Sequence, residues 1–130
     1  MIKGVGIDIM DISRIEKQIL KHGRRFIDRV FSSEEIAYCE TKVHRSRHYA
    51  ARFAAKEAVM KALGTGLGRG MSWHDVVIIS DEQGQPAVRL SRKARELAEE
   101  MGVGRAHISL SHSHDNAVAM VMLESHDEVK

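Results

Sequence analysis

The chain has 130 residues, of which 43% are hydrophobic and 29% charged, so it can fold around a core of its own. No apolar stretch approaches the roughly 18 residues of a membrane-spanning helix, and residues 1–12 lack the basic flank and apolar run of a secretory signal. A single cysteine, Cys39, excludes an internal disulfide and a cysteine metal cluster. We therefore expect one domain spanning residues 1–130, located in the cytoplasm.

Basic residues gather in one segment, although the whole chain carries a net charge of only +2. Between residues 14 and 29, six basic residues stand against two acidic ones, which gives this segment a net charge of +4. The six are Arg14, Lys17, Lys21, Arg24, Arg25 and Arg29. Such a patch indicates an acidic partner. A solvated helix face is the alternative, because Lys and Arg usually lie at protein surfaces.

The first predicted element is a buried strand over residues 2–9. Gly4, Gly6 and Asp8 share one face of it, and the glycines leave room for another element to approach the backbone closely. Asp11 is better placed than Asp8 to cap the helix that follows. Asp8 is therefore either a solvated residue at a strand end or a carboxylate with a functional role.

Three helical segments follow this strand. Apolar residues recur with helical spacing over residues 12–21, and Gly23 ends that segment. Residues 26–31 predict a second, short helical piece. The capping-box pattern that begins at Ser32 predicts a third helix, which continues to about residue 42.

Residues 44–63 predict the longest helix, around which we expect the rest of the chain to be organised. This segment is rich in alanine and free of proline, and Gly64 follows its end. At 100° per residue, four of the alanines fall on one narrow face that can approach another element closely. These four are Ala51, Ala55, Ala58 and Ala62.

The charged residues of this helix fall into two sectors. Arg52 and Lys56 form the sector that we expect to face solvent. Glu57 and Lys61 form the other, at the i,i+4 spacing that favours an ion pair. If this pair is exposed, it contributes only about 0.3–0.5 kcal/mol. The apolar flanks of Glu57 leave a second interpretation open, in which a half-buried carboxylate requires a partner or a metal.

The second half of the chain supplies most of the predicted strands. Residues 64–70 form a glycine-rich turn that follows a helix, which rules out a Rossmann fingerprint but leaves a backbone able to face phosphates. We then expect a strand at 73–80, a turn at 81–85 and a strand at 87–90 with Pro86 at its start. Ser91 is expected to cap a helix through Met101, which Gly102 ends. A strand at 107–111, a turn at 112–116, a strand at 117–123 buried on both faces, and a frayed polar tail at 124–130 follow. This order predicts an α+β fold with an antiparallel sheet packed against the long central helix.

Three histidines lie close together near the end of the chain. His107 shares a strand face with Ser109 and Ser111, and His112 and His114 follow. A zinc site is conceivable, but exposed or hydrogen-bonded histidines are favoured because closed zinc sites usually take four ligands and no cysteine lies nearby. Asp8 and Glu57 are better candidates for a metal, since Mg²⁺ prefers carboxylates together with substrate phosphates.

Several motifs together resemble those of the 4′-phosphopantetheinyl transferases. The two main ones are Gly6-Ile7-Asp8-Ile9 with Arg14-Ile15, and the run from Phe53 to Ala62. The length and three further segments resemble the holo-[acyl-carrier-protein] synthase branch of that family. These segments are Gly64-Thr65-Gly66, Ser72-Trp73-His74-Asp75 and the run from His107 to His112. The resemblance covers residues 1–123.

This resemblance implies an activity and a site. A member of the branch moves the phosphopantetheine arm of coenzyme A onto a serine of apo-acyl carrier protein, releases adenosine 3′,5′-bisphosphate and supports fatty acid biosynthesis. Asp8 and Glu57 would bind Mg²⁺, and Lys61 would contact the phosphates and is a candidate to protonate the leaving group. The serine proton would pass either to Glu57 or to a metal-bound water.

The resemblance also implies partners. Family members of this branch are homotrimers with active sites between subunits, so His107 and Ser109 would reach a neighbour's nucleotide. The implied coenzyme A contacts are Arg52, Lys61, Gly64, Thr65, Gly66, His107 and Ser109. The basic patch would orient the acidic carrier protein through Arg14, Lys21, Arg24 and Arg25. Two alternatives remain: a nucleic-acid-binding module, which would need exposed aromatic residues among the basic ones, and a purely structural trimer-forming domain.

Overall fold

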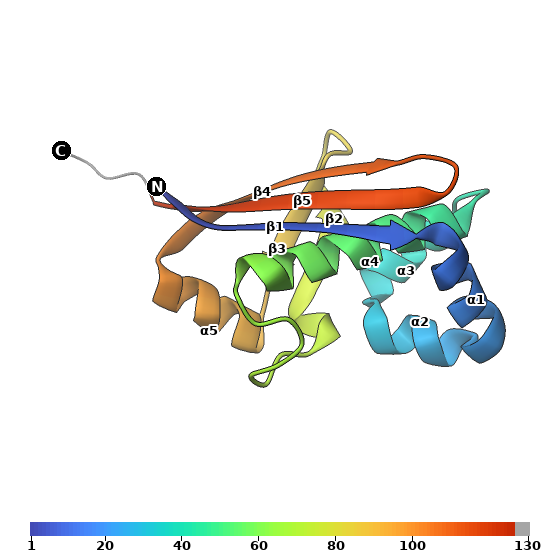
Figure 1. Ribbon diagram of the computed structural model, residues 1–130, viewed down its shortest axis with the longest axis horizontal. Helices are drawn as coiled ribbons and strands as arrows, with labels where there is room; N and C mark the ends of the chain where they lie inside the picture. The colour runs from blue at the N-terminus through green and yellow to red at the C-terminus, as the bar shows by residue number, and fades with distance from the viewer. Residues whose placement is uncertain (127–130) are drawn as a thin grey trace.

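The long helix α4 (Arg45–Ala62) lies along one face of a three-stranded antiparallel sheet in the computed structural model, which describes residues 1–126 (Figure 1). The strand order is β1 (Ile2–Asp11), β5 (Asn116–Ser125) and β4 (Val103–His112). A separate ribbon pairs β2 (Val76–Ser80) with β3 (Pro86–Leu90). The predicted α+β fold, with an antiparallel sheet against a long helix, is confirmed.

The remaining helices lie on the same side of the sheet as α4. Figure 1 shows α1, α2 and α3 near the end of β1, whereas α5 lies near the other end of the sheet. Their bounds are α1 (Ile12–His22), α2 (Arg24–Val30), α3 (Ser33–Glu40) and α5 (Arg92–Met101). Within residues 1–126, no helix combines the length and the apolar character that crossing a membrane would require.

The contact between β1 and α4 is made by glycines against a helix backbone. A Cβ placed on Gly6 would lie 1.9 Å from the carbonyl oxygen of Ala58, and one on Gly4 would lie 2.2 Å from that of Ala62. Only glycine therefore fits at these two positions. The predicted close approach is confirmed, and the approaching element is the alanine face of α4.

Three helix ends follow the predicted local signals. Asp11 accepts a hydrogen bond from Ser13 N at the start of α1, and Ser32 and Glu35 form the capping box of α3. Gly102 ends α5 in the left-handed conformation that glycine favours. At Ser91 the prediction of a cap is wrong in part, because this residue precedes α5 but its side chain makes no capping hydrogen bond.

Several predicted strands differ from those observed. The strand expected at 107–111 already begins at Val103, and the strand expected to be buried at 2–9 leaves Ile7 and Ile9 exposed. The strand expected at 73–80 begins only at Val76, because Ser72 caps a short 3-10 turn, η1 (Trp73–Asp75). The strand expected at 117–123 is buried on one face rather than two. Its Ala119 is fully buried, whereas Met120 remains 41% exposed on the outer face of the sheet.

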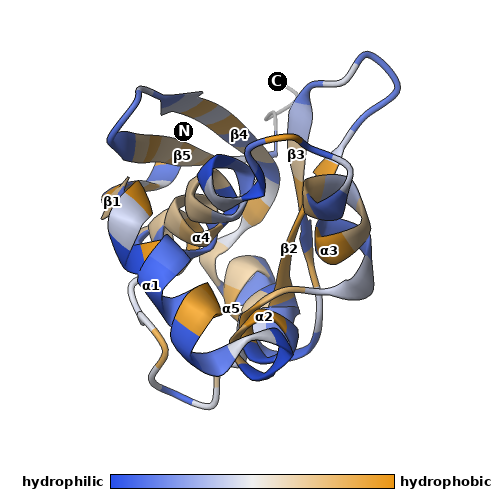
Figure 2. Ribbon diagram, turned by 90° about the vertical axis from the view of Figure 1, so that its right-hand side faces the viewer, coloured by the Kyte–Doolittle hydropathy of each residue, from blue (hydrophilic) through white to orange (hydrophobic). Residues whose placement is uncertain are grey.

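Two further predictions concern the middle and the end of the chain. Arg52 and Lys56 were expected at the surface of α4, but both are buried, because α3 and β2 cover that side of the helix (Figure 2). The predicted tail at 124–130 is wrong in its first part, since β5 continues through Ser125. Residues 127–130 lie outside the described part of the chain.

Candidate functional site

Asp8 and Lys61 meet at the edge where β1 passes α4. Lys61 Nζ donates to Asp8 Oδ1 over 2.9 Å and to the carbonyl oxygen of Ile7 over 3.0 Å. The other carboxylate oxygen, Asp8 Oδ2, is buried and has no hydrogen-bond partner within residues 1–126. A buried polar atom without a partner is costly, so this oxygen is available to a ligand.

Glu57 lies on α4, the helix that also carries Lys61, and faces Asp8. Burial raises the pKa of Glu57, the charge of Asp8 raises this pKa further, and Lys61 acts against both effects. Of the two interpretations left open for Glu57, the half-buried carboxylate agrees with the structure, because Lys61 pairs with Asp8 rather than with Glu57. Two carboxylates therefore share a partly buried region in which Lys61 pairs with only one of them.

A pocket of about 410 Å³ opens beside these two carboxylates. Its lining includes the charged residues Asp8, Glu57 and Arg14. Aromatic residues line it as well, namely Phe26, Phe53 and Trp73. The pocket therefore offers both charged and apolar contacts to a ligand.

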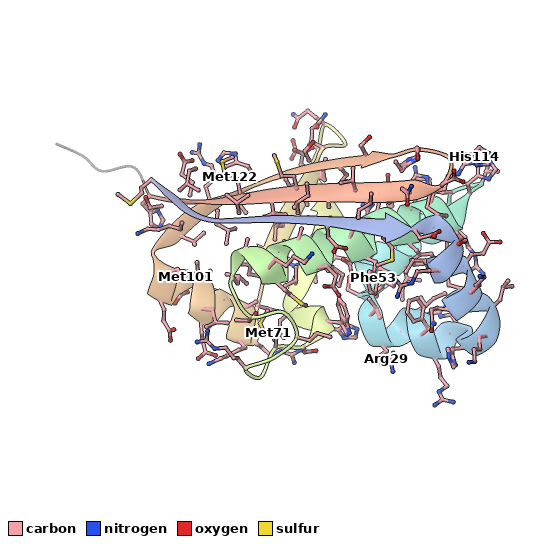
Figure 3. All side chains as sticks on the ribbon, viewed as in Figure 1. Arg29, Phe53, Met71, Met101, His114 and Met122 are labelled. Carbon is pink, nitrogen blue, oxygen red and sulfur yellow. The ribbon has the colours of Figure 1, made fainter. Side chains whose placement is uncertain are left out.

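The aromatic residues of the pocket were not predicted from the sequence. The Phe53 ring lies 5.0 Å from the Trp73 ring and 6.4 Å from the Phe26 ring, measured between centroids. Figure 3 shows Phe53 between α4 and the helices α1 and α2. The sequence did indicate that Phe53 lies near Glu57, because the two residues are four apart and so lie on the same side of α4.

The basic patch of α1 and α2 continues from this pocket. Arg14 lines the pocket itself, and Arg29 and Phe26 line both it and an adjoining hollow of about 190 Å³. Arg25 lines that second hollow. The patch therefore borders the carboxylate site.

The other two residues predicted for carrier-protein binding also lie on these helices. Lys21 is exposed in the last turn of α1. Arg24, also exposed, holds Asp28 at 2.9 Å on α2. All four predicted carrier contacts thus belong to the α1–α2 surface.

Arg52 and Ser109 meet in a different hollow, of about 180 Å³. The Arg52 guanidinium lies 3.8 Å from the centre of the Tyr38 ring and donates to Ser80 Oγ over 3.4 Å. Arg52 Nε is buried without a partner in the described chain. Arg52 therefore keeps an N–H donor without a partner next to this hollow.

The remaining predicted coenzyme A contacts lie in two further places. His107 Nε2 is 3.0 Å from Glu124 Oε1, across the β4–β5 pair. Gly64 and Gly66 adopt positive φ angles of 82° and 57° in the turn after α4, and Thr65 Oγ1 donates to the carbonyl oxygen of Gly66. In one chain, the predicted contacts thus do not form a single site.

Histidines do not form a metal centre in the described residues. No group of three or more His, Cys, Asp or Glu side chains between residues 1 and 126 is arranged to hold a metal ion. His112 instead packs against the His48 ring, with 5.7 Å between centroids. The candidate cation ligands are therefore the two carboxylates, Asp8 and Glu57.

Comparison with known proteins agrees with this fold and identifies the family. The model of the 4′-phosphopantetheinyl transferase superfamily matches residues 4–121. The holo-[acyl-carrier-protein] synthase of Geobacter sp. (strain M21) is 48% identical over 124 residues, which cover 95% of this chain and 99% of the relative.

Two solved structures are also similar. The holo-[acyl-carrier-protein] synthase of Neisseria meningitidis superposes with a TM-score of 0.88 at 34% identity, covering 96% of this chain and 100% of the other. The Helicobacter pylori synthase, solved in complex with coenzyme A, gives a TM-score of 0.81 at 34% identity, covering 92% and 99%. The chain therefore belongs to the 4′-phosphopantetheinyl transferase superfamily and, within it, to the holo-[acyl-carrier-protein] synthases, which makes it an enzyme. The resemblance inferred from the motifs is confirmed.

Proposed function

We propose that the protein is a cytoplasmic transferase that moves 4′-phosphopantetheine from coenzyme A to a serine of apo-acyl carrier protein, in support of fatty acid biosynthesis. The observation that carries this proposal is the grouping of Asp8, Glu57 and Lys61 beside a pocket that aromatic residues also line. Family membership and the coenzyme A complex of the Helicobacter pylori relative support it.

The carboxylates suit a magnesium ion. Asp8 Oδ2 is buried without a partner, and the pKa of Glu57 is raised by its burial and by Asp8, so a divalent cation would relieve both unfavourable features. Mg²⁺ typically takes one or two carboxylates and completes its shell with substrate phosphates and water. Asp8 and Glu57 would hold the ion, which when bound would neutralise charge on the pyrophosphate of coenzyme A.

Lys61 is the residue best placed to act on the departing phosphate. Its amine is half exposed beside the pocket and keeps a fixed position through its bonds to Asp8 and Ile7. The serine oxygen would form a bond to the β-phosphorus as the bond from this phosphorus to the bridging oxygen breaks, which releases adenosine 3′,5′-bisphosphate. Lys61 would stabilise the charge that develops on that oxygen and could supply its proton.

Glu57 is the residue that we propose to accept the proton that the serine loses. Burial and Asp8 raise its pKa when no cation is bound, and the cation that Glu57 would help to hold would act against this rise. Glu57 lies on α4 one turn before Lys61, so the proposed base and the phosphate-binding amine share one rigid element.

The α1–α2 surface would receive the carrier protein. Arg14 borders the reacting groups, and Lys21, Arg24 and Arg25 extend the positive charge away from them. Phe26 and Phe31, which a nucleic-acid-binding surface would expose for stacking, are buried. These positions favour an acidic protein partner that is steered by charge.

The outer face of the three-stranded sheet supports a homotrimer with sites between subunits. Val5, Ile7 and Ile9 of β1 are each more than half exposed there, and Met120 of β5 lies beside them. An exposed apolar face of this kind marks a protein–protein interface. In such an assembly, His107 and Ser109 of one subunit would approach the Lys61 region of another, which joins contacts that one chain keeps apart.

The test is a mass spectrum of an apo-acyl carrier protein after incubation with this protein, coenzyme A and Mg²⁺. We expect the acceptor to gain the mass of one phosphopantetheine group, and we expect no gain with Glu57→Ala. A matched acceptor without the modifiable serine controls for reaction elsewhere. An unmodified acceptor across several carrier proteins would contradict the proposal.

A further inference from the structure

A second ion pair lies in the interior of the protein, apart from the pocket. Lys56 Nζ and Glu35 Oε1 are 2.7 Å apart, and both side chains are 0% exposed. Neither residue lines the pocket beside Asp8. Because the cost of desolvating two charges can equal or exceed their attraction, stability alone does not account for this pair.

The pair joins three elements through well-formed hydrogen bonds. The Glu35 carboxylate of α3 accepts from Ser32 N over 2.8 Å and from Ile78 N of β2 over 2.8 Å. Lys56 of α4 also donates to the carbonyl oxygen of Val76 over 2.6 Å. The network therefore ties α4 to α3 and to the first residues of β2.

The opposite side of α4 packs on β1 through small residues. There its alanine face meets Gly4 and Gly6, and these small residues set how close α4 and β1 can approach. Lys61 also crosses this contact to Asp8, but its side chain is half exposed, whereas the Lys56–Glu35 pair is fully buried. The Lys56 network is therefore the buried polar tie that holds α4 to the elements on its other side.

Lys56 directly precedes Glu57, and this adjacency links the anchor to the site. Consecutive residues of a helix are related by about 100° and a rise of 1.5 Å, so an anchored Lys56 also fixes the direction and height of Glu57. Lys61 lies one turn further along the same helix. A small slide or rotation of α4 would displace both residues relative to Asp8 on β1.

We infer that Glu35 and Lys56 are positioning residues for the transfer reaction: they fix the rotation and axial position of α4 so that Glu57 and Lys61 face Asp8. This inference rests on the proposed roles of those three residues. The pair touches no substrate and acts through the helix backbone. Since an error of about 1 Å in a reacting geometry can cost on the order of 100-fold in rate, a loosened α4 is expected to slow transfer.

The experiment uses Lys56→Met, Glu35→Gln and the double variant that combines them. Each single change leaves a buried group without its partner, so we expect a loss of stability. The double variant removes both charges and is expected to recover stability relative to Lys56→Met. Because it still lacks the anchor, its turnover number should be at least about 10-fold below that of wild type. It should also bind Mn²⁺ more weakly. Mn²⁺ is the probe because it takes the same oxygen ligands as Mg²⁺.

Two control variants separate positioning from general damage. Glu34→Gln alters the neighbouring residue of α3, whose exposed side chain pairs with Arg89, and should leave turnover and Mn²⁺ binding unchanged. Leu97→Ala removes a buried side chain of α5 and should lower stability without changing Mn²⁺ affinity, measured where the variant is folded.

The outcomes are distinguishable. Wild-type turnover and Mn²⁺ affinity in the double variant would overturn the inference and leave the pair a purely structural feature. Equal losses in Leu97→Ala would also overturn it, because they would trace to stability alone. If wild type itself neither binds Mn²⁺ nor modifies an acceptor, the proposed function fails, and the inference fails with it.

Discussion

Replacing Gly6 by alanine perturbs the contact that brings Asp8 to α4. The added Cβ would lie 1.9 Å from the carbonyl oxygen of Ala58 and 2.9 Å from its carbonyl carbon. Ordinary contact begins at 3.4 Å, so β1 and α4 must separate by about 1.5 Å at this point. The obstructing atoms belong to the backbone of α4 and cannot swing aside as a side chain would.

Two consequences follow from this separation. Overpacking of this type typically costs about 1–3 kcal/mol of unfolding free energy, and we expect at least that for Gly6→Ala. Asp8 is two residues further along β1, so its distance from Glu57 and Lys61 should grow by a comparable amount. A displacement of about 1 Å can lower the rate on the order of 100-fold.

The assay combines urea unfolding with the rate of carrier-protein modification, measured where the variant is folded. Gly68→Ala is the matched control, because its Cβ would come no closer than 3.4 Å to another atom and its φ angle is not positive. Ala58→Gly should fail to rescue Gly6→Ala, since the clash is with the backbone oxygen. Wild-type stability and rate in Gly6→Ala, or rescue by Ala58→Gly, would refute this reasoning.

Three other properties of the molecule give separate expectations. Reversing the charge of Arg24 (Arg24→Glu) should raise the KM for the carrier protein at low salt without changing the KM for coenzyme A. The control Arg95→Glu on α5 should change neither KM. An unchanged KM for the carrier protein would contradict the assignment of the α1–α2 surface to carrier binding. The raised pKa of Glu57 means that the folded protein binds this proton more tightly than the unfolded chain, so its stabilising contribution is present below the ordinary value of 4.5 and is lost as pH rises through the folded pKa. Without divalent cations, urea unfolding should therefore show a fall in stability with rising pH that Glu57→Gln lacks, and equal pH profiles would count against it. If the protein forms the proposed homotrimer, replacing Ile7 by lysine should dissociate it in analytical ultracentrifugation, and an unchanged sedimentation coefficient would exclude the outer sheet face as the interface.

Local signals in the sequence predicted the structure correctly in two situations. In the first, the two residues of a contact lie near each other in the chain. In the second, one face of a helix or strand consists of small residues. The Ser32–Glu35 capping box spans four residues, and its pattern alone defines its hydrogen bonds. Glycines on one face of β1 and alanines on one face of α4 predicted close contacts, because few other arrangements use such small residues.

The predictions were wrong where a residue distant in the sequence determines the environment of a side chain. Lys56 looked solvent-exposed because helical spacing does not reveal that Glu35, 21 residues earlier, neutralises it in the interior. The sequence could not decide whether Lys61 pairs with Glu57 on its own helix, because the packing of β1 supplies Asp8 at 2.9 Å. Both outcomes depend on tertiary contacts that periodicity cannot encode.

The strand β5 illustrates a different limit. Its apolar residues predicted burial on both faces, whereas one chain covers only the face that carries Ala119. Met122 lies on the other face of the sheet (Figure 3). A hydrophobic pattern predicts that a side chain is buried, but it does not indicate whether the residues that bury it belong to the same chain or to another copy.

The most direct test of the central claim is a Mn²⁺ titration followed by electron paramagnetic resonance, because the account requires Asp8 and Glu57 to form one cation site. Wild type should bind Mn²⁺, and coenzyme A should tighten this binding through its pyrophosphate. Asp8→Asn and Glu57→Gln should each weaken binding by at least about 10-fold, as loss of a charged ligand would, while Arg95→Gln should not. Equal Mn²⁺ affinity in all four proteins would contradict the assignment of Asp8 and Glu57 as the site at which the pyrophosphate is bound and cleaved.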